Sequence, residues 1–187
     1  IEAYKERYPD LIKELIPDPI PYQRLTEVLQ RLVQEEVSIR NIKTILHALG
    51  EKRTETKVPA LVEEVRYALA RQITSKIVGY RPQLFFYVLD PGLEERIRTS
   101  LKPTATGFRL AFPDPQDIDR IQQSAASAVG VAPPGAQKPV IVTSVDIRYA
   151  VRHILKFTLP QAAVLSYDEL HPDLMTQPLG MISIGRN

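Results

Sequence analysis

Apolar side chains recur every three or four residues along the first part of the chain, the spacing that builds the buried face of an amphipathic helix. The spacing predicts a short helix around residues 11–16, which a group of prolines ends. Longer helices are expected over residues 22–35, over residues 40–49, and from Pro59 to about Ile73. In the second of these, Ser38 is placed as the N-cap and Gly50 as the C-cap. Residues 1–77 are therefore expected to form a compact helical subdomain.

The periodicity changes around Gly79–Pro82, and short apolar runs then alternate with amphipathic stretches. Strands are expected over residues 84–89, 108–112, 140–143, 163–166 and 179–184, and helices over 91–101, from 114 or 116 to 129, and over 144–156. Burial in a single sheet is expected for Leu84, Phe86, Val88, Val140 and Val142. The predicted fold class is α+β, with an N-terminal helical subdomain over 1–77 followed by a mixed α/β sandwich subdomain over 82–187.

Composition narrows the class of protein. The chain has 187 residues, of which 44% are hydrophobic and 25% charged, as is ordinary for a globular protein. It contains no cysteine, which excludes disulfides, thiolate zinc sites and cysteine nucleophiles. No apolar stretch approaches the roughly 20 residues that cross a bilayer. The sequence begins at Ile1 with a charged segment, so it predicts no signal peptide and is consistent with a fragment of a longer protein.

The sequence offers no recognisable catalytic or cofactor site. Its histidines, His47, His153 and His171, lack the helical spacing that lets two of them hold one metal ion. No Gly-x-Ser-x-Gly turn and no glycine-rich phosphate loop is present. The adjacent carboxylates Glu35/Glu36, Glu63/Glu64 and Glu94/Glu95 point in different directions on their helices and are interpreted as solvated faces. We therefore expect no enzyme activity, no cofactor and no metal.

Two basic helix faces remain as candidates for binding. Helices 22–35 and 40–49 resemble a helix-turn-helix, with Arg40, Lys43 and His47 projecting from the second helix. A winged-helix-like nucleic-acid-binding module with an α/β regulatory domain is therefore the alternative function. Charge argues against it, because residues 1–77 carry 13 basic and 12 acidic residues and residues 78–187 carry 11 and 10, a net charge of +1 in each part.

The other basic face lies on the helix over residues 144–156. Arg148, Arg152 and Lys156 recur every four residues and are expected to form one exposed stripe, with Ile147, Val151, Ile154 and Leu155 on the buried side. Two interpretations of this stripe remain open. It is either a solvated helix end, where positive charge interacts favourably with the helix dipole, or a surface that contacts an acidic partner. The proline-rich segment Ala132–Pro139 is expected to form a semi-rigid rim beside it.

Two sequence blocks resemble the export-gate proteins of bacterial type III secretion, the FlhA/SctV family. The first block runs from Val28 to Arg40, ends in Glu-Val-Ser-Ile-Arg and leads into Ile42–Leu46. The second comprises Pro139-Val-Ile-Val-Thr-Ser-Val-Asp-Ile-Arg148, Leu159–Leu170 with its Ser-Tyr-Asp-Glu-Leu, and Gln177-Pro-Leu-Gly-Met-Ile182. The blocks stand in the family's order, and the resemblance covers nearly the whole chain. The second block favours the injectisome branch, which serves virulence, over the flagellar branch.

The resemblance implies a non-enzymatic part of a protein-export machine at the bacterial inner membrane, lying on the cytoplasmic side. Residues 1–77 would be the family's third cytoplasmic subdomain and residues 82–187 its fourth, with membrane attachment only through an N-terminal region absent here. The family's cytoplasmic regions form a ring, usually nonameric, that receives chaperone–substrate complexes, a gatekeeper and the ATPase stalk protein. On this basis Arg40, Lys43 and His47 are predicted to lie in the ring interface, and Arg148, Arg152 and Lys156 to dock an acidic partner; no nucleic acid is expected.

Overall fold

A computed structural model describes residues 20–52, 57–80, 83–104, 107–130 and 137–185, together with Pro9 and Lys13. Apart from Lys13, the predicted helix around residues 11–16 lies outside the described residues, as does most of the predicted rim Ala132–Pro139. The chain divides into two compact units, Ile1–Ile73 and Thr74–Asn187. The division falls inside the helix α6 (Ala70–Val78). It lies slightly before the boundary that the change of periodicity predicts.

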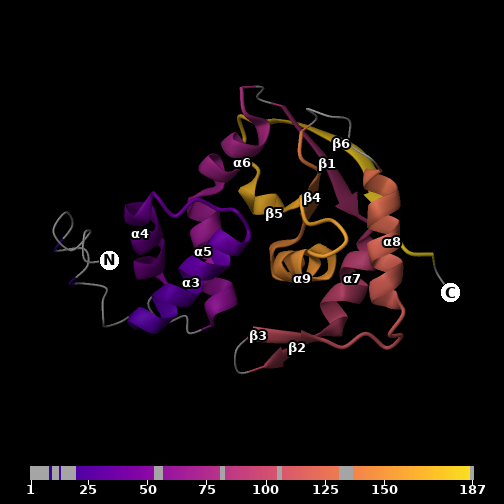
Figure 1. Ribbon diagram of the computed structural model, residues 1–187, viewed down its shortest axis with the longest axis horizontal. Coiled ribbons are helices and arrows are strands. Elements are labelled where there is room, and N and C mark those ends of the chain that lie inside the picture. Colours follow the sequence, from indigo (N-terminus) through magenta and orange to yellow (C-terminus); the bar gives the residue numbers. More distant parts are fainter. Residues whose placement is uncertain are drawn as a thin grey trace. The chain divides into compact units, whose positions relative to one another are not determined.

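The first unit is helical. Its helices are α3 (Tyr22–Gln34), α4 (Ile42–Glu51), α5 (Val58–Ala68) and the first residues of α6 (Figure 1). Both α3 and α4 pack against α5. Several apolar side chains of these helices are almost fully buried: Leu25, Val28, Leu32, Ile45, Leu49, Leu61 and Val65. The helical periodicity of the sequence therefore describes the buried faces of this unit correctly.

The connection between α3 and α4 differs from the prediction. Asn41, not Ser38, is the N-cap of α4, and its side chain accepts the backbone N–H of Thr44 at 3.4 Å. The Ser38 hydroxyl instead accepts the N–H of Arg40, so it supports the turn before the helix. Gly50 is not the C-cap, because α4 continues to Glu51 and is capped at Lys52. The predicted N-cap was wrong because two residue types with capping ability, Ser38 and Asn41, lie close together at this helix start. The predicted C-cap was wrong because Gly50 remains inside the last turn of the helix.

The end of α3 is closed by a Schellman motif. The N–H of Val37 bonds to the carbonyl of Leu32 at 2.9 Å, and the N–H of Glu36 bonds to that of Val33 at 3.0 Å. This pattern requires a left-handed residue, and Glu36 occupies that position with a φ of 58°. Val37 and Leu32 are both buried, which supplies the apolar contact that accompanies the motif. A non-glycine residue there adopts a backbone conformation that costs about 1–2 kcal/mol.

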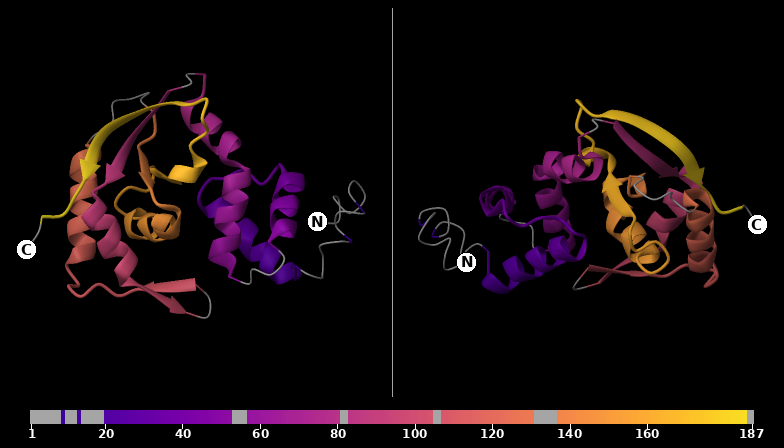
Figure 2. Two further views of the ribbon diagram at one scale, coloured as in Figure 1. Left: turned by 180° about the vertical axis from the view of Figure 1, so that it is seen from behind. Right: turned by 45° about the horizontal axis from the view of Figure 1, so that its top comes forward.

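The second unit is built around a four-stranded parallel sheet. In the order β5-β4-β1-β6 its strands are Ala163–Ser166, Val140–Thr143, Gln83–Leu89 and Met175–Ile182 (Figures 1 and 2). The helices α7 (Pro91–Ser100), α8 (Asp117–Val129) and α9 (Val145–Leu155) connect β1 to β4 and β4 to β5. A short 3-10 helix, η1 (Tyr167–Glu169), begins the return from β5 to β6. An antiparallel hairpin, β2 (Leu101–Thr104) with β3 (Gly107–Leu110), forms a separate two-stranded sheet.

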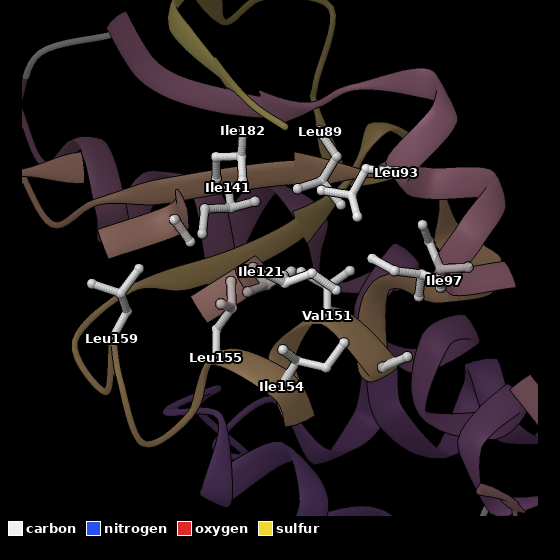
Figure 3. Packing of buried hydrophobic residues seen from close by; sticks show 14 of the residues in the cluster. Leu89, Leu93, Ile97, Ile121, Ile141, Val151, Ile154, Leu155, Leu159 and Ile182 are labelled. Atoms are coloured by element: carbon white, nitrogen blue, oxygen red, sulfur yellow. The ribbon is translucent and has the colours of Figure 1, made fainter. Parts of the chain in front are cut away.

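One hydrophobic core joins the three helices to one face of the sheet. The chain moves from β1 to β4 and on to β5 in a constant direction, so right-handed crossovers place α7, α8 and α9 on the same face. The core contains side chains from all three helices and all four strands. Figure 3 shows Leu93, Ile121 and Val151 of the helices gathered with Leu89, Ile141 and Ile182 of the strands. The return from β5 to β6 runs in the opposite direction along the sheet, so a right-handed crossover sends it over the other face.

The structure confirms the α+β fold class and most of the predicted sheet. Leu84, Phe86, Val140 and Val142 are buried, and Val88 is partly buried. The strand β2 was missed, because Leu101 was assigned to the preceding helix. The last strand begins at Met175, four residues before the prediction, since it pairs with β1 from Gln83 onward. The two paired strands are distant in sequence, and the first residues of β6 are exposed. The sequence therefore shows no apolar pattern that would mark the start of this strand.

Candidate interaction surfaces

The predicted ring face lies on the outside of the first unit. Arg40 precedes α4, and Lys43 and His47 follow on successive turns of that helix. All three side chains are exposed, while Ile42, Ile45, Leu46 and Leu49 on the other side are buried. The face is therefore available for contact as the spacing indicates.

The predicted basic stripe on α9 does not exist as an exposed surface, because Arg148 is fully buried at 0% exposure. Its guanidinium Nη1 donates to the carbonyl oxygen of Val164 in β5 at 3.3 Å. Seven residues separate Arg148 from the buried Leu155, and seven residues are about two turns, so the two lie on nearly the same side of the helix. The apolar face of α9 is wider than the sequence analysis assumed, and its edge includes Arg148.

Arg152 holds the loop after α9 in place. Its Nη1 donates to the carbonyl of Ala162 at 3.0 Å, and its Nη2 donates to that of Pro160 at 3.4 Å. The side chain is only partly exposed. A guanidinium that satisfies two carbonyls at the end of a helix stabilises the loop locally. Arg152 therefore has a structural role in this unit that the sequence pattern did not indicate.

Lys156 lies at the end of α9 beside two rings. Its Nζ is 3.4 Å from Nδ1 of His153 and 4.8 Å from the ring centroid of Phe157, a cation–π geometry. Partial burial and, secondarily, the charge of Lys156 lower the pKa of His153 below its ordinary value of 6.5. Phe157 itself is 81% exposed. The sequence analysis did not single out Phe157, although a large aromatic directly after a helix end is a visible signal.

A hydrogen-bond network occupies the carboxyl ends of β4 and β5. The Glu94 carboxylate of α7 accepts the Thr143 hydroxyl at 2.8 Å, the Ser144 N–H at 3.0 Å and the Ser144 hydroxyl at 2.7 Å. Partial burial and, secondarily, the charge of Glu94 raise the pKa of Tyr167, which follows β5, above its usual value. Glu94 thus ties α7 to the start of α9, and its interpretation as part of a solvated pair was wrong. Glu95 is exposed and pairs with Arg98 at 2.6 Å.

Within the described residues no group of three or more histidine and carboxylate side chains gathers as a metal site would require. Across the same part of the chain, none of the helices is both long and apolar enough to cross a membrane.

Comparison with known proteins identifies the family. The model of the FHIPEP family matches residues 1–175. The chain belongs to the FHIPEP family. Low calcium response locus protein D of Yersinia pestis is 36% identical over 185 residues, which cover 98% of this chain and 26% of that protein. The flagellar biosynthesis protein FlhA of Bacillus subtilis is 30% identical, again over 185 residues, with 98% and 27% covered. These relatives confirm the resemblance to type III secretion export gates.

Solved structures of export-gate proteins share the fold. CdsV of Chlamydia pneumoniae, solved in a complex with CdsO, aligns with a TM-score of 0.89 and 40% identity over 97% of this chain and 52% of that one. The nonameric SctV-C of EPEC aligns with a TM-score of 0.86 and 29% identity, covering 97% and 54%. The export-gate chain described here thus spans about a quarter of the length of its curated relatives and about half of these solved chains.

Proposed function

We propose that this chain is a cytoplasmic part of a type III secretion export gate, in which it helps to form a ring below the export channel. The observation that carries the proposal is its similarity, along 97% of its length, to a cytosolic domain solved as a nonamer. The two units would be the third and fourth subdomains of that region, and a preceding part of the full-length protein would attach it to the inner membrane. The role is that of a docking platform without catalysis.

The face on α4 is proposed as one side of the ring contact. A closed ring needs two different faces on each subunit, and Arg40, Lys43 and His47 are exposed on a helix whose other side is buried. The complementary face would come from elsewhere in the full-length protein. Exchange of Arg40 and Lys43 for Glu in that protein should therefore weaken ring assembly and secretion together.

A matched variant controls for the change in charge. Arg71 and Lys76 are also exposed, and both lie on α6, so Arg71→Glu with Lys76→Glu alters the net charge equally. Ring content is measured by native mass spectrometry of the cytoplasmic region and secretion by export of a reporter. Normal rings and secretion in the α4 variant would remove these residues from the interface. A loss that is equal in both variants would point to net charge instead.

The second unit is proposed to dock partners of the export machine: chaperone–substrate complexes, a gatekeeper and the ATPase stalk. Arg152 and Lys156 remain from the predicted stripe, whereas Arg148 is withdrawn because it is buried. CdsV has been solved in a complex with CdsO, which supports the idea that proteins of this family meet other proteins. Pull-down of secretion components by the full-length protein tests the proposal. Tight, salt-sensitive binding to duplex DNA in a gel-shift assay would favour the nucleic-acid alternative instead.

A further inference from the structure

The two edges of the four-stranded sheet are protected differently. The strand β5 forms one edge, has four residues and is largely buried. In a strand the N–H and C=O of one residue point to one side, and those of the next residue point to the other. The N–H of Ala163 bonds to the carbonyl of Pro139 on the β4 side, so the Val164 backbone faces the free edge. There its carbonyl accepts a hydrogen bond from the buried Arg148, which closes this edge.

The strand at the other edge, β6, is long and exposed (Figure 2). Six of its eight residues are exposed, and Met175, Leu179 and Met181 are each more than half exposed. By sequence, no charged residue occurs from Leu174 to Gly185. Sheet edges are usually protected by charged side chains, by proline, by a register shift or by a covering element, because an open edge pairs with other chains. Charge gives β6 no such protection.

The backbone of Pro178 faces this free edge. The side chain of Gln137 bonds both the N–H and the C=O of Phe85, at 3.4 and 3.1 Å, so Phe85 faces away from β6 and the next residue, Phe86, faces toward it. A residue that faces a parallel neighbour bonds the two residues on either side of its register partner, and the register partner of Phe86 is Pro178. Pro178 itself therefore faces outward, where it has no N–H to donate. The register of the two strands shifts directly after this pair.

The far end of the same edge is capped by a side chain. The N–H of Asp90 bonds to the carbonyl of Ile182 at 2.9 Å, so Ile182 faces β1 and the next residue, Ser183, faces outward. The Ser124 hydroxyl of α8 donates to the Ser183 carbonyl at 2.7 Å. Between the start of β6 and this cap, Pro178 is the residue that interrupts the outward row of backbone donors.

We propose that Pro178 prevents β6 from pairing edge to edge with a strand of a second copy of this chain. A second copy is the relevant partner because it carries the same uncharged strand, and self-pairing needs no other protein. A strand added along this edge would place one of its carbonyls opposite the proline nitrogen, where that carbonyl loses water and gains no donor. Pro178 thus leaves the apolar side chains of β6 exposed without strand pairing. The inference does not depend on the proposed ring.

The experiment restores the missing donor in the purified full-length protein. Pro178→Thr supplies an N–H and a residue that favours strands, whereas Pro178→Lys supplies the same N–H together with a charge on the edge. Sedimentation velocity over a concentration series measures self-association, and hydrogen exchange of β6 peptides reports whether this strand takes part. We expect Pro178→Thr to associate beyond the wild-type oligomer at a concentration at least about tenfold lower than the wild-type protein does, with added protection of β6 amides. Pro178→Lys should match the wild-type protein.

Pro160→Thr controls for the loss of a proline as such, because Pro160 is exposed in the loop after α9. This variant should behave like the wild-type protein. Unchanged association of Pro178→Thr would overturn the inference. Equal association of Pro178→Thr and Pro178→Lys would also overturn it, because a loosened fold rather than an open edge would then drive association. The same holds if Pro178→Thr associates without added protection of β6.

Discussion

Removal of the Glu94 carboxylate should destabilise the second unit far more than removal of its neighbour Glu95. Glu94 accepts three hydrogen bonds from Thr143 and Ser144, and these join α7 to the end of β4. A hydrogen bond to a charged group contributes about 1.5–3 kcal/mol. The three bonds share one partly exposed carboxylate, and water replaces some of them, so we expect Glu94→Ala to cost about 2–4 kcal/mol in total.

Glu95 provides the matched control. It occupies the same helical turn and carries the same charge, but its partner is the exposed Arg98. Exposed ion pairs contribute only about 0.2–1 kcal/mol, so Glu95→Ala should have a small effect. The loss of stability in Glu94→Gln should lie between those of the two alanine variants. The amide oxygen can still accept a hydrogen bond, whereas the amide nitrogen is itself a donor and faces a donor.

The assay must report the second unit alone, since a chain of two units need not unfold in one step. Hydrogen exchange followed by mass spectrometry on peptides from β4 gives the free energy of opening for that unit. Urea unfolding followed by circular dichroism gives the slope of free energy against urea concentration, which should stay unchanged. If Glu94→Ala and Glu95→Ala differ by less than about 0.5 kcal/mol, the network does not stabilise the unit and the reasoning fails.

Two further predictions concern the core and the end of α9. Val142→Asp should lower the free energy of unfolding by about 5 kcal/mol, because it removes apolar burial and leaves an unpaired polar group in the core. Val142→Ala serves as the milder reference. An unchanged urea midpoint for Val142→Asp would contradict the placement of β4. The pKa of His153 is lowered in the fold, so protonation opposes folding: its contribution is present above pH 6.5 and is lost as the pH falls through 6.5 toward the lower folded pKa. Lys156→Gln should raise the pKa of His153 in an NMR titration. An unchanged pKa would mean that burial alone lowers it.

Local patterns in the sequence determined much of the fold. The apolar faces of α3, α4 and α5 follow from helical periodicity, and the continuous run at β1 follows from burial on both sides of a parallel sheet. Asp90 followed by Pro91 marks the start of α7 because a carboxylate cap and a first-turn proline act on adjacent residues. The two blocks shared with export-gate proteins also sufficed to identify the family.

Tertiary packing decided the features that matter for binding. Arg148 lies at the edge of the apolar face of α9. Only the position of β5 beside the helix makes that edge an interior site, where the Val164 carbonyl accepts a hydrogen bond from the guanidinium. Glu94 looks like a solvated residue until β4 brings Thr143 and Ser144 to it from about fifty residues away. The loop after α9 is fixed only because Arg152 bonds the carbonyl of Ala162 and Leu159 is buried in the core. Spacing along one helix gives the direction of each side chain, whereas its environment depends on elements distant in sequence.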